Sequence, residues 1–67
     1  MSRFRVYLTF RSEPIDVDLP FCSLRDLSGL ASASRYLEGH LAEPDEEGTF
    51  AGVLIPTSRI QLIIHLS

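Results

Sequence analysis

Three side chains of the sequence belong to the types that act as nucleophiles, bases or metal ligands: Cys22, His40 and His65. Their spacing matches neither a metal site nor a nucleophile with its base. Cys22 precedes a predicted helix, whose N-terminus would make a thiol more acidic. His40 lies at the other end of that helix, roughly 25 Å away at 1.5 Å per residue. We therefore interpret Cys22 as a small buried apolar residue and predict no enzyme activity, no cofactor and no metal.

A second group of polar residues is acidic and lies close together in the chain: Glu43, Asp45, Glu46 and Glu47. A calcium loop needs oxygen ligands at alternate positions and a distal glutamate, and this group lacks both. The surrounding segment 42–49 also contains proline and glycine, which are typical of turns. The sequence therefore predicts a solvated acidic loop over residues 42–49.

The one stretch that resembles a ligand-binding surface carries three arginines and a tyrosine: Arg3, Arg5, Tyr7 and Arg11. Basic residues interleaved with an aromatic ring on a sheet face can hold phosphates and stack a base. Asp16 and Asp18 lie on the next strand, so cross-strand ion pairs account for the same face without a ligand. The formal net charge of −3 argues against general affinity for nucleic acid. Ion pairing is the preferred interpretation, and nucleic-acid binding is the alternative.

These residues lie on a predicted β-hairpin over residues 3–19. Residues 3–10 and 15–19 both alternate between apolar and polar side chains, which is the pattern of half-buried strands. Only an even loop length places apolar residues opposite apolar residues on one face. The predicted pairs are Phe10 with Ile15, Leu8 with Val17, and Val6 with Leu19.

A helix is predicted over residues 23–40, because leucines recur there at spacings of three and four. Ser23 is the expected N-cap, and Asp26, three residues later, forms an approximate capping box. Two more strands, roughly 49–55 and 59–66, are expected to form a second hairpin over residues 49–66. The expected pairs are Ile55 with Ile60, Val53 with Leu62, and Ala51 with Ile64.

The predicted fold class is therefore α+β, with one small β-β-α-β-β domain over residues 1–67. One helix would cover one face of a four-stranded, mainly antiparallel sheet. The chain has 67 residues, of which 45% are hydrophobic. A domain of this size buries only about 60% of the surface that its unfolded chain exposes. Its stability is expected to be marginal without association.

A self-association surface is predicted on the sheet face away from the helix, because the second hairpin places apolar side chains there. Its residues are Phe50, Leu54 and Ile63, with His65 at the rim. One helix screens only one face of a sheet, so the other is covered either by a curled sheet or a tail that folds over it, or by a second copy. A second copy is the preferred interpretation. A two-fold homodimer is the expected arrangement.

Composition points to a cytoplasmic, bacterial protein. With one cysteine the chain has no internal disulfide, and the longest uncharged apolar run, 60–66, is too short to cross a bilayer. All six basic residues are arginine, as expected from a GC-rich genome. The short stretch Leu54-Ile55-Pro56 with Ile60 resembles part of the second motif of Sm-like proteins, but it assigns no family.

Taken with the absence of a catalytic motif, these observations predict a non-catalytic protein-binding or regulatory module that self-associates. The alternatives are a nucleic-acid-binding regulator that uses the arginine face and a small accessory subunit of a larger complex.

Overall fold

The computed structural model describes residues 2–66, and it shows five antiparallel strands with one α-helix. Strands β1 (Ser2–Leu8) and β2 (Ile15–Leu19) pair as the alternation predicts, but in a different register. Leu19 lies opposite Ser2 and not Val6. This shift is even, so it keeps every apolar residue on the same face, and the alternation does not distinguish the two registers.

The end of β1 explains the shift in register. Beyond Leu8 the chain turns, with the Arg11 amide donating to the Leu8 carbonyl at 3.2 Å. The Thr9 amide donates to the carbonyl of Arg59 at 2.8 Å, toward the other neighbour of β1 and away from β2. Phe10 therefore falls outside the ladder with Ile15 and is 63% exposed.

Helix α1 (Leu24–Ala31) begins where the sequence predicts and ends much earlier. The Ser23 hydroxyl accepts a hydrogen bond from the Asp26 amide at 3.3 Å, which is the expected N-cap. The predicted second half of the helix is instead a turn followed by strand β3 (Tyr36–Leu41). A spacing of four between Leu37 and Leu41 fits the inner face of a strand as well as a helix stripe.

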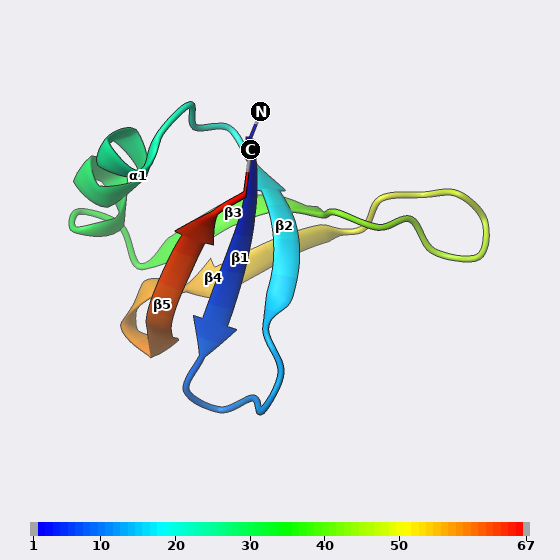
Figure 1. Cartoon of the computed structure of the whole chain (residues 1–67), viewed down its shortest axis with the longest axis horizontal. Coiled ribbons are helices and arrows are strands. Elements are labelled where there is room, and N and C mark those ends of the chain that lie inside the picture. Colours follow the sequence, from blue (N-terminus) through cyan, green and yellow to red (C-terminus); the bar gives the residue numbers. More distant parts are fainter. Residues whose placement is uncertain (1, 67) are drawn as a thin grey trace.

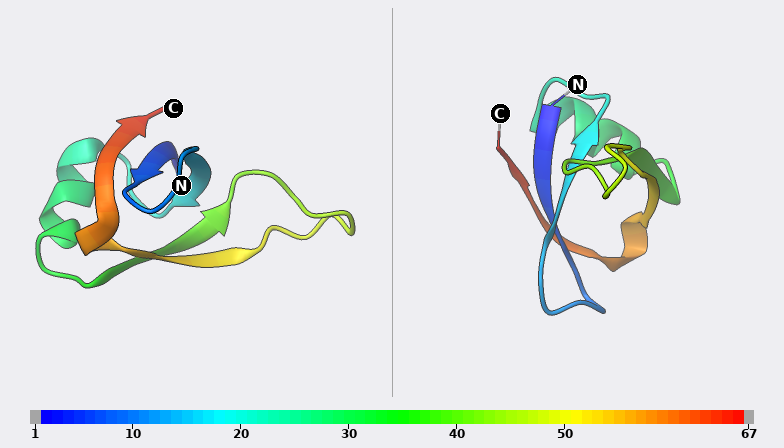
Figure 2. Two further views of the ribbon diagram at one scale, coloured as in Figure 1. Left: turned by 90° about the horizontal axis from the view of Figure 1, so that it is seen from below. Right: turned by 90° about the vertical axis from the view of Figure 1, so that its right-hand side faces the viewer.

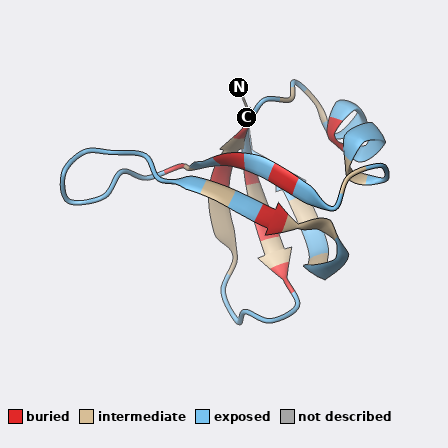
Figure 3. Ribbon diagram, turned by 180° about the vertical axis from the view of Figure 1, so that it is seen from behind, coloured by how far each residue is buried: buried red, intermediate tan, exposed pale blue. Residues whose placement is uncertain are grey.

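Strand β3 lies between β2 and β4 (Gly52–Pro56), which supply the hydrogen bonds that a longer helix would have made internally. Buried and exposed positions alternate along β3, as Figure 3 shows. Leu37 faces Ile55, and Gly39 faces Val53. The segment between β3 and β4 contains the predicted acidic loop, and residues 43–50 are all exposed.

Strand β5 (Ile60–His65) pairs with β1 and not with β4, so the predicted second hairpin and its pairs are wrong. The sheet order is β4-β3-β2-β1-β5, which places β4 and β5 at its two edges. Only a three-residue 3-10 turn, η1 (Thr57–Arg59), joins these two edge strands. The sheet must therefore curl to bring its edges near each other (Figures 1 and 2).

The curled sheet encloses most of the core itself. Seven of the eight buried core residues come from strands, and the helix contributes one. They are Phe4, Val6, Leu8, Val17, Leu19, Leu37 and Ile55 from the strands and Leu27 from α1. The helix thus closes one part of the core, and it does not cover a whole sheet face as predicted.

Candidate functional site

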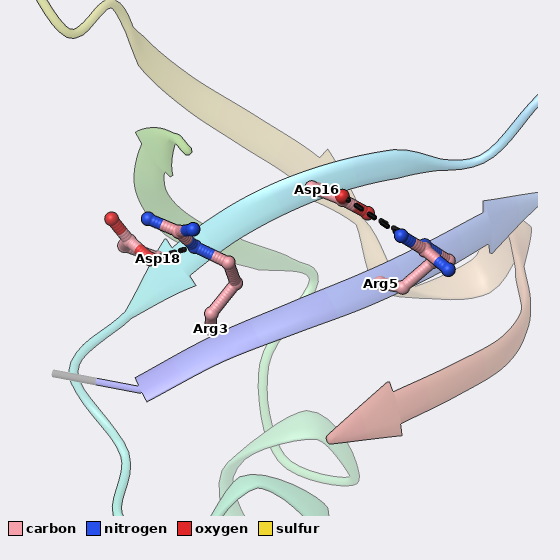
Figure 4. Close-up of polar contacts among 4 residues, drawn as sticks. All are labelled: Arg3, Arg5, Asp16 and Asp18. Carbon is pink, nitrogen blue, oxygen red and sulfur yellow. Dashed lines mark hydrogen bonds and ion pairs between the residues drawn. The ribbon is translucent and has the colours of Figure 1, made fainter. Parts of the chain in front are cut away.

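The arginine face of β1 is held by two cross-strand ion pairs (Figure 4). Arg5 lies directly opposite Asp16, with Nε–Oδ1 at 2.9 Å and a second contact, Nη2–Oδ2, at 3.1 Å. Arg3 lies opposite Asp18, with Nε–Oδ1 at 3.3 Å. These contacts agree with the ion pairing that the sequence predicts for this face, and the observed register places each arginine directly opposite its aspartate.

These contacts set the electrostatics of the face. The hydrogen bond from Arg5 lowers the pKa of Asp16, against a smaller opposing effect of desolvation. The same hydrogen bond, with the charge of Asp16, raises the pKa of Arg5. Arg11, the fourth residue of the predicted phosphate face, lies beyond the end of β1 in the turn. The strand therefore offers Tyr7 and two arginines whose charges are already balanced by aspartates.

Cys22 and the two histidines lie in three different settings. Cys22 is exposed, so the prediction that it is buried is wrong. Phe21 is the neighbour that packs against the core. His40 is exposed on β3, whereas the ring of His65 stacks on Phe4 with the centroids 4.7 Å apart. Among residues 2–66, no group of three or more histidine, cysteine, aspartate or glutamate side chains is placed to hold a metal ion.

The acidic loop is organised by one of its own carboxylates. Oδ1 of Asp45 accepts hydrogen bonds from the amides of Glu47 and Thr49, both at 2.9 Å. Gly48 follows with φ of +82°, a conformation that favours glycine, and its amide donates to the Asp45 carbonyl at 3.0 Å. These bonds account for the position of Asp45 as part of a turn.

The predicted self-association residues are not brought together on one surface. Leu54 faces outward on β4 and is 63% exposed, whereas Ile63 packs against the core from the opposite edge strand. His65 also points inward, onto Phe4. Phe50 is about half exposed in the segment that leads into β4.

A β-bulge in β5 explains why Ile63 points inward. Tyr7 faces Leu62, but Leu8 faces Ile60, so Gln61 is an extra residue on β5. An extra residue reverses the alternation of side chains beyond it. Ile60 and Ile63, three residues apart, therefore both pack against the core. Both faces of this strand carry apolar side chains in the sequence, so the sequence does not show which face points outward.

The outward side chains at this end of the chain are apolar and were not predicted as a site. They are Leu62, Ile64 and Leu66, exposed by 53%, 39% and 38% respectively. Leu62 and Ile64 belong to β5, a strand that contains no Asp, Glu, Lys or Arg, and Leu66 follows its end. The signal in the sequence was the absence of any charge after Arg59, because solvent-facing strand positions are ordinarily polar.

The two edges of the sheet differ in how well they resist pairing with another strand. Strand β4 contains Gly52 and ends in Pro56, residues that weaken a strand or lack an amide donor. Strand β5 has no proline, no glycine and no charged side chain. Charges, prolines, short lengths and bulges are the features by which edge strands avoid unwanted partners. The bulge of β5 at Gln61 lies near the start of the strand, and residues 62–65 beyond it contain no proline and no Asp, Glu, Lys or Arg. The edge of β5 over residues 62–65 is the candidate functional site.

Comparisons with protein-family models, curated proteins and solved structures find no match to this chain. In the part of the chain that the structure describes, no helix has the length and apolar character needed to span a membrane.

Proposed function

We propose that the protein is a non-catalytic protein-binding module in which the edge of β5 receives an extended strand from another polypeptide. The observation that carries this proposal is an edge strand with apolar outward side chains and, beyond the bulge at Gln61, no charged residue or proline to oppose pairing. Addition of a strand to an exposed sheet edge is a recurring mode of peptide recognition. Main-chain hydrogen bonds supply affinity, and alternate side chains supply selectivity.

The ladder with β1 determines which backbone groups of β5 are free for a partner. The Leu66 amide donates to the Arg3 carbonyl at 2.9 Å, so Leu66 points its backbone groups toward β1. In an antiparallel pair these groups alternate from residue to residue. Those of Ile64 and Leu62 therefore also point toward β1, and those of Ile63 and His65 point away from it. A partner strand would pair with Ile63 and His65.

The outward side chains of Leu62 and Ile64 would contact the side chains of the incoming strand on one face. Cross-strand pairs of this kind contribute roughly 0.2–1 kcal/mol each. An extended segment with apolar residues at alternate positions is therefore the favoured ligand. Nucleic-acid binding through the arginine face of β1 is less well supported than strand binding, because Arg5 and Arg3 already form ion pairs with Asp16 and Asp18.

Binding of a labelled peptide tests this function directly. The probe is a fluorescein-labelled peptide of alternating isoleucine and threonine with lysine ends, and the readout is fluorescence anisotropy at increasing protein concentration. We expect saturable binding, which Leu62→Lys weakens about fivefold, equivalent to about 1 kcal/mol. The matched control Leu54→Lys, at a position that is also exposed, should bind like the natural chain.

A second peptide of the same charge, with proline at its central position, controls for electrostatic attraction to the acidic protein. Proline removes an amide donor, so this peptide should not pair with the edge. Equal binding of both peptides, or no saturable binding of either, would contradict the proposed function.

A further inference from the structure

The geometry points to a second copy of this chain as the occupant of the β5 edge, bound antiparallel about a two-fold axis at Ile63. This inference rests on the proposed function, because it takes the β5 edge as the strand-binding site. It adds the identity of the partner and the register of the contact, neither of which follows from strand binding alone.

The register follows from the backbone groups that β5 leaves unpaired. Those of Ile63 point away from β1, so Ile63 can exchange both main-chain hydrogen bonds with Ile63 of the second copy. A two-fold axis at this pair then places Leu62 opposite Ile64 of the second copy, and Ile64 opposite Leu62. Both apolar residues of one strand thus meet apolar residues of the other on the outward face.

Charge favours this pairing of identical strands. The chain has a net charge of −3, so the repulsion between two copies is smaller when they meet at a surface without acidic residues. No side chain of β5 carries a carboxylate or a fixed positive charge. On the neighbouring strand, Arg5 lies beside Ile64, and its charge is balanced by Asp16. The contact therefore brings no like charges together.

The edge of β4 is a poorer partner for β5 than β5 itself. Pro56 has no amide hydrogen to donate, and Gly52 has no side chain to cover Leu62 or Ile64. A contact between β4 and β5 would also be head-to-tail and would leave a free edge at each end of the assembly. Pairing of β5 with β5 is isologous, and it closes with two copies.

The contact involves a substantial exposed apolar surface for so small a chain. Leu62 and Ile64 are exposed by 53% and 39% in one copy, and in the dimer Leu62 of each copy would lie beside Ile64 of the other. Small domains commonly supplement a limited core by oligomerisation. The dimer therefore covers the exposed leucine and isoleucine of both copies and adds main-chain hydrogen bonds at the same edge.

Sedimentation equilibrium of the whole chain from about 1 µM to 1 mM tests the assembly. We expect a reversible monomer–dimer equilibrium, which Leu62→Lys or Ile64→Lys shifts toward monomer by at least tenfold in dissociation constant. Leu54→Lys is the control and should leave the equilibrium unchanged. Circular dichroism of each variant establishes that it is folded, as expected for substitutions at partly exposed positions.

Nuclear magnetic resonance on the same samples tests the register. In a mixture of isotope-labelled and unlabelled chains, the α-protons of Leu62 and Ile64 from different copies should give a cross-peak. In an antiparallel ladder, residues that face each other without exchanging hydrogen bonds have Cα atoms about 4.5 Å apart. Alternate residues of one strand, such as Leu62 and Ile64 of the same copy, are separated by nearly 7 Å. The amide of Ile63 should also become protected from hydrogen exchange as concentration rises.

The outcomes separate this inference from the function on which it rests. A chain that stays monomeric to 1 mM but binds the isoleucine–threonine peptide overturns the dimer and leaves strand binding intact. A dimer that survives both lysine substitutions, or that lacks the Leu62–Ile64 cross-peak, uses another surface and also overturns it. A chain that neither dimerises nor binds the peptide contradicts both proposals.

Discussion

Gly39 on β3 lies directly against the backbone of Asp18 on β2. A Cβ atom on Gly39 would be 2.5 Å from the Asp18 carbonyl oxygen and 2.5 Å from Cδ2 of Leu19. Leu19 is fully buried, so neither neighbour has room to withdraw. Glycine at this position is therefore required by the contact between two strands rather than by any unusual backbone conformation.

We expect Gly39→Ala to destabilise the fold by about 1–3 kcal/mol, the usual cost of overpacking. Gly29→Ala is the matched control, because a Cβ there meets nothing within 4 Å. That control should raise stability by up to about 1 kcal/mol, since alanine favours a helix interior over glycine. Urea denaturation of both variants measures the difference, and equal effects of the two substitutions would contradict the β2–β3 contact.

Leu27 is the residue through which the helix joins the core. It is 2% exposed, whereas Leu30 on the same helix is 44% exposed. Leu27→Ala should cost about 2–5 kcal/mol because it leaves a cavity, and this is a large part of the stability of a small domain. Leu30→Ala should cost much less in the same thermal or chemical denaturation. A similar loss for both would show that the helix packs through a different face.

Thr57 forms hydrogen bonds that connect the turn between the two edge strands to the segment before β3. Its hydroxyl lies 2.7 Å from the Ser34 carbonyl oxygen and 3.0 Å from that of Arg35, and its amide donates to Arg35 at 2.9 Å. Thr57→Val keeps the shape and removes the hydroxyl donor. We expect a loss of roughly 1 kcal/mol in the free energy of unfolding. Ser58→Ala, at the exposed neighbouring position, is the control and should be neutral.

The ion pair between Arg5 and Asp16 makes stability depend on pH in the acid range. Arg5 donates a hydrogen bond to the carboxylate of Asp16 and holds the pKa of this group below its usual range. The stabilisation is therefore complete above the pKa that Asp16 has in the unfolded chain, and it is lost as pH falls through the lower folded-state pKa. Its size is small, because both side chains remain partly solvated.

Comparison of the natural chain with Asp16→Asn, by urea denaturation at pH 7 and at several points below pH 4, measures this dependence. The difference in stability between them should shrink with falling pH. In an Arg5→Gln background the same comparison should show a weaker pH dependence, because the hydrogen-bond donor is gone. An unchanged dependence would show that Arg5 does not determine the titration of Asp16.

Local patterns in the sequence are enough to identify several elements. The alternation in residues 3–10 and 15–19 predicts two strands of one antiparallel pair, and Ser23 with Asp26 predicts the start of the helix. The turn chemistry of residues 42–49 predicts an exposed loop, and residues 43–49 are exposed whereas Ala42 is buried. Each of these signals acts between residues that are near in the chain, so it does not depend on the rest of the fold.

The candidate site, in contrast, depended on contacts between distant segments. Nothing near Ile60 in the sequence indicates that β5 pairs with β1, or that a bulge at Gln61 turns Ile63 inward and Leu62 outward. The uncharged stretch after Arg59 led to the prediction of a self-association surface that included Ile63. In the structure Ile63 packs against the core, because one extra residue reverses the alternation.

The end of the helix shows the same division between local and tertiary causes. Leucines four residues apart satisfy both a helix stripe and the inner face of a strand, so the spacing of Leu37 and Leu41 left the two structures unresolved. The neighbouring strands β2 and β4 decided in favour of a strand, because they offer backbone partners on both sides of β3. The apolar residues and the starts of the turns can be identified from the chain alone, because turns form through interactions within a few residues. Which strands meet, and which face of β5 is outward, depends on hydrogen bonds and packing between segments far apart in the chain.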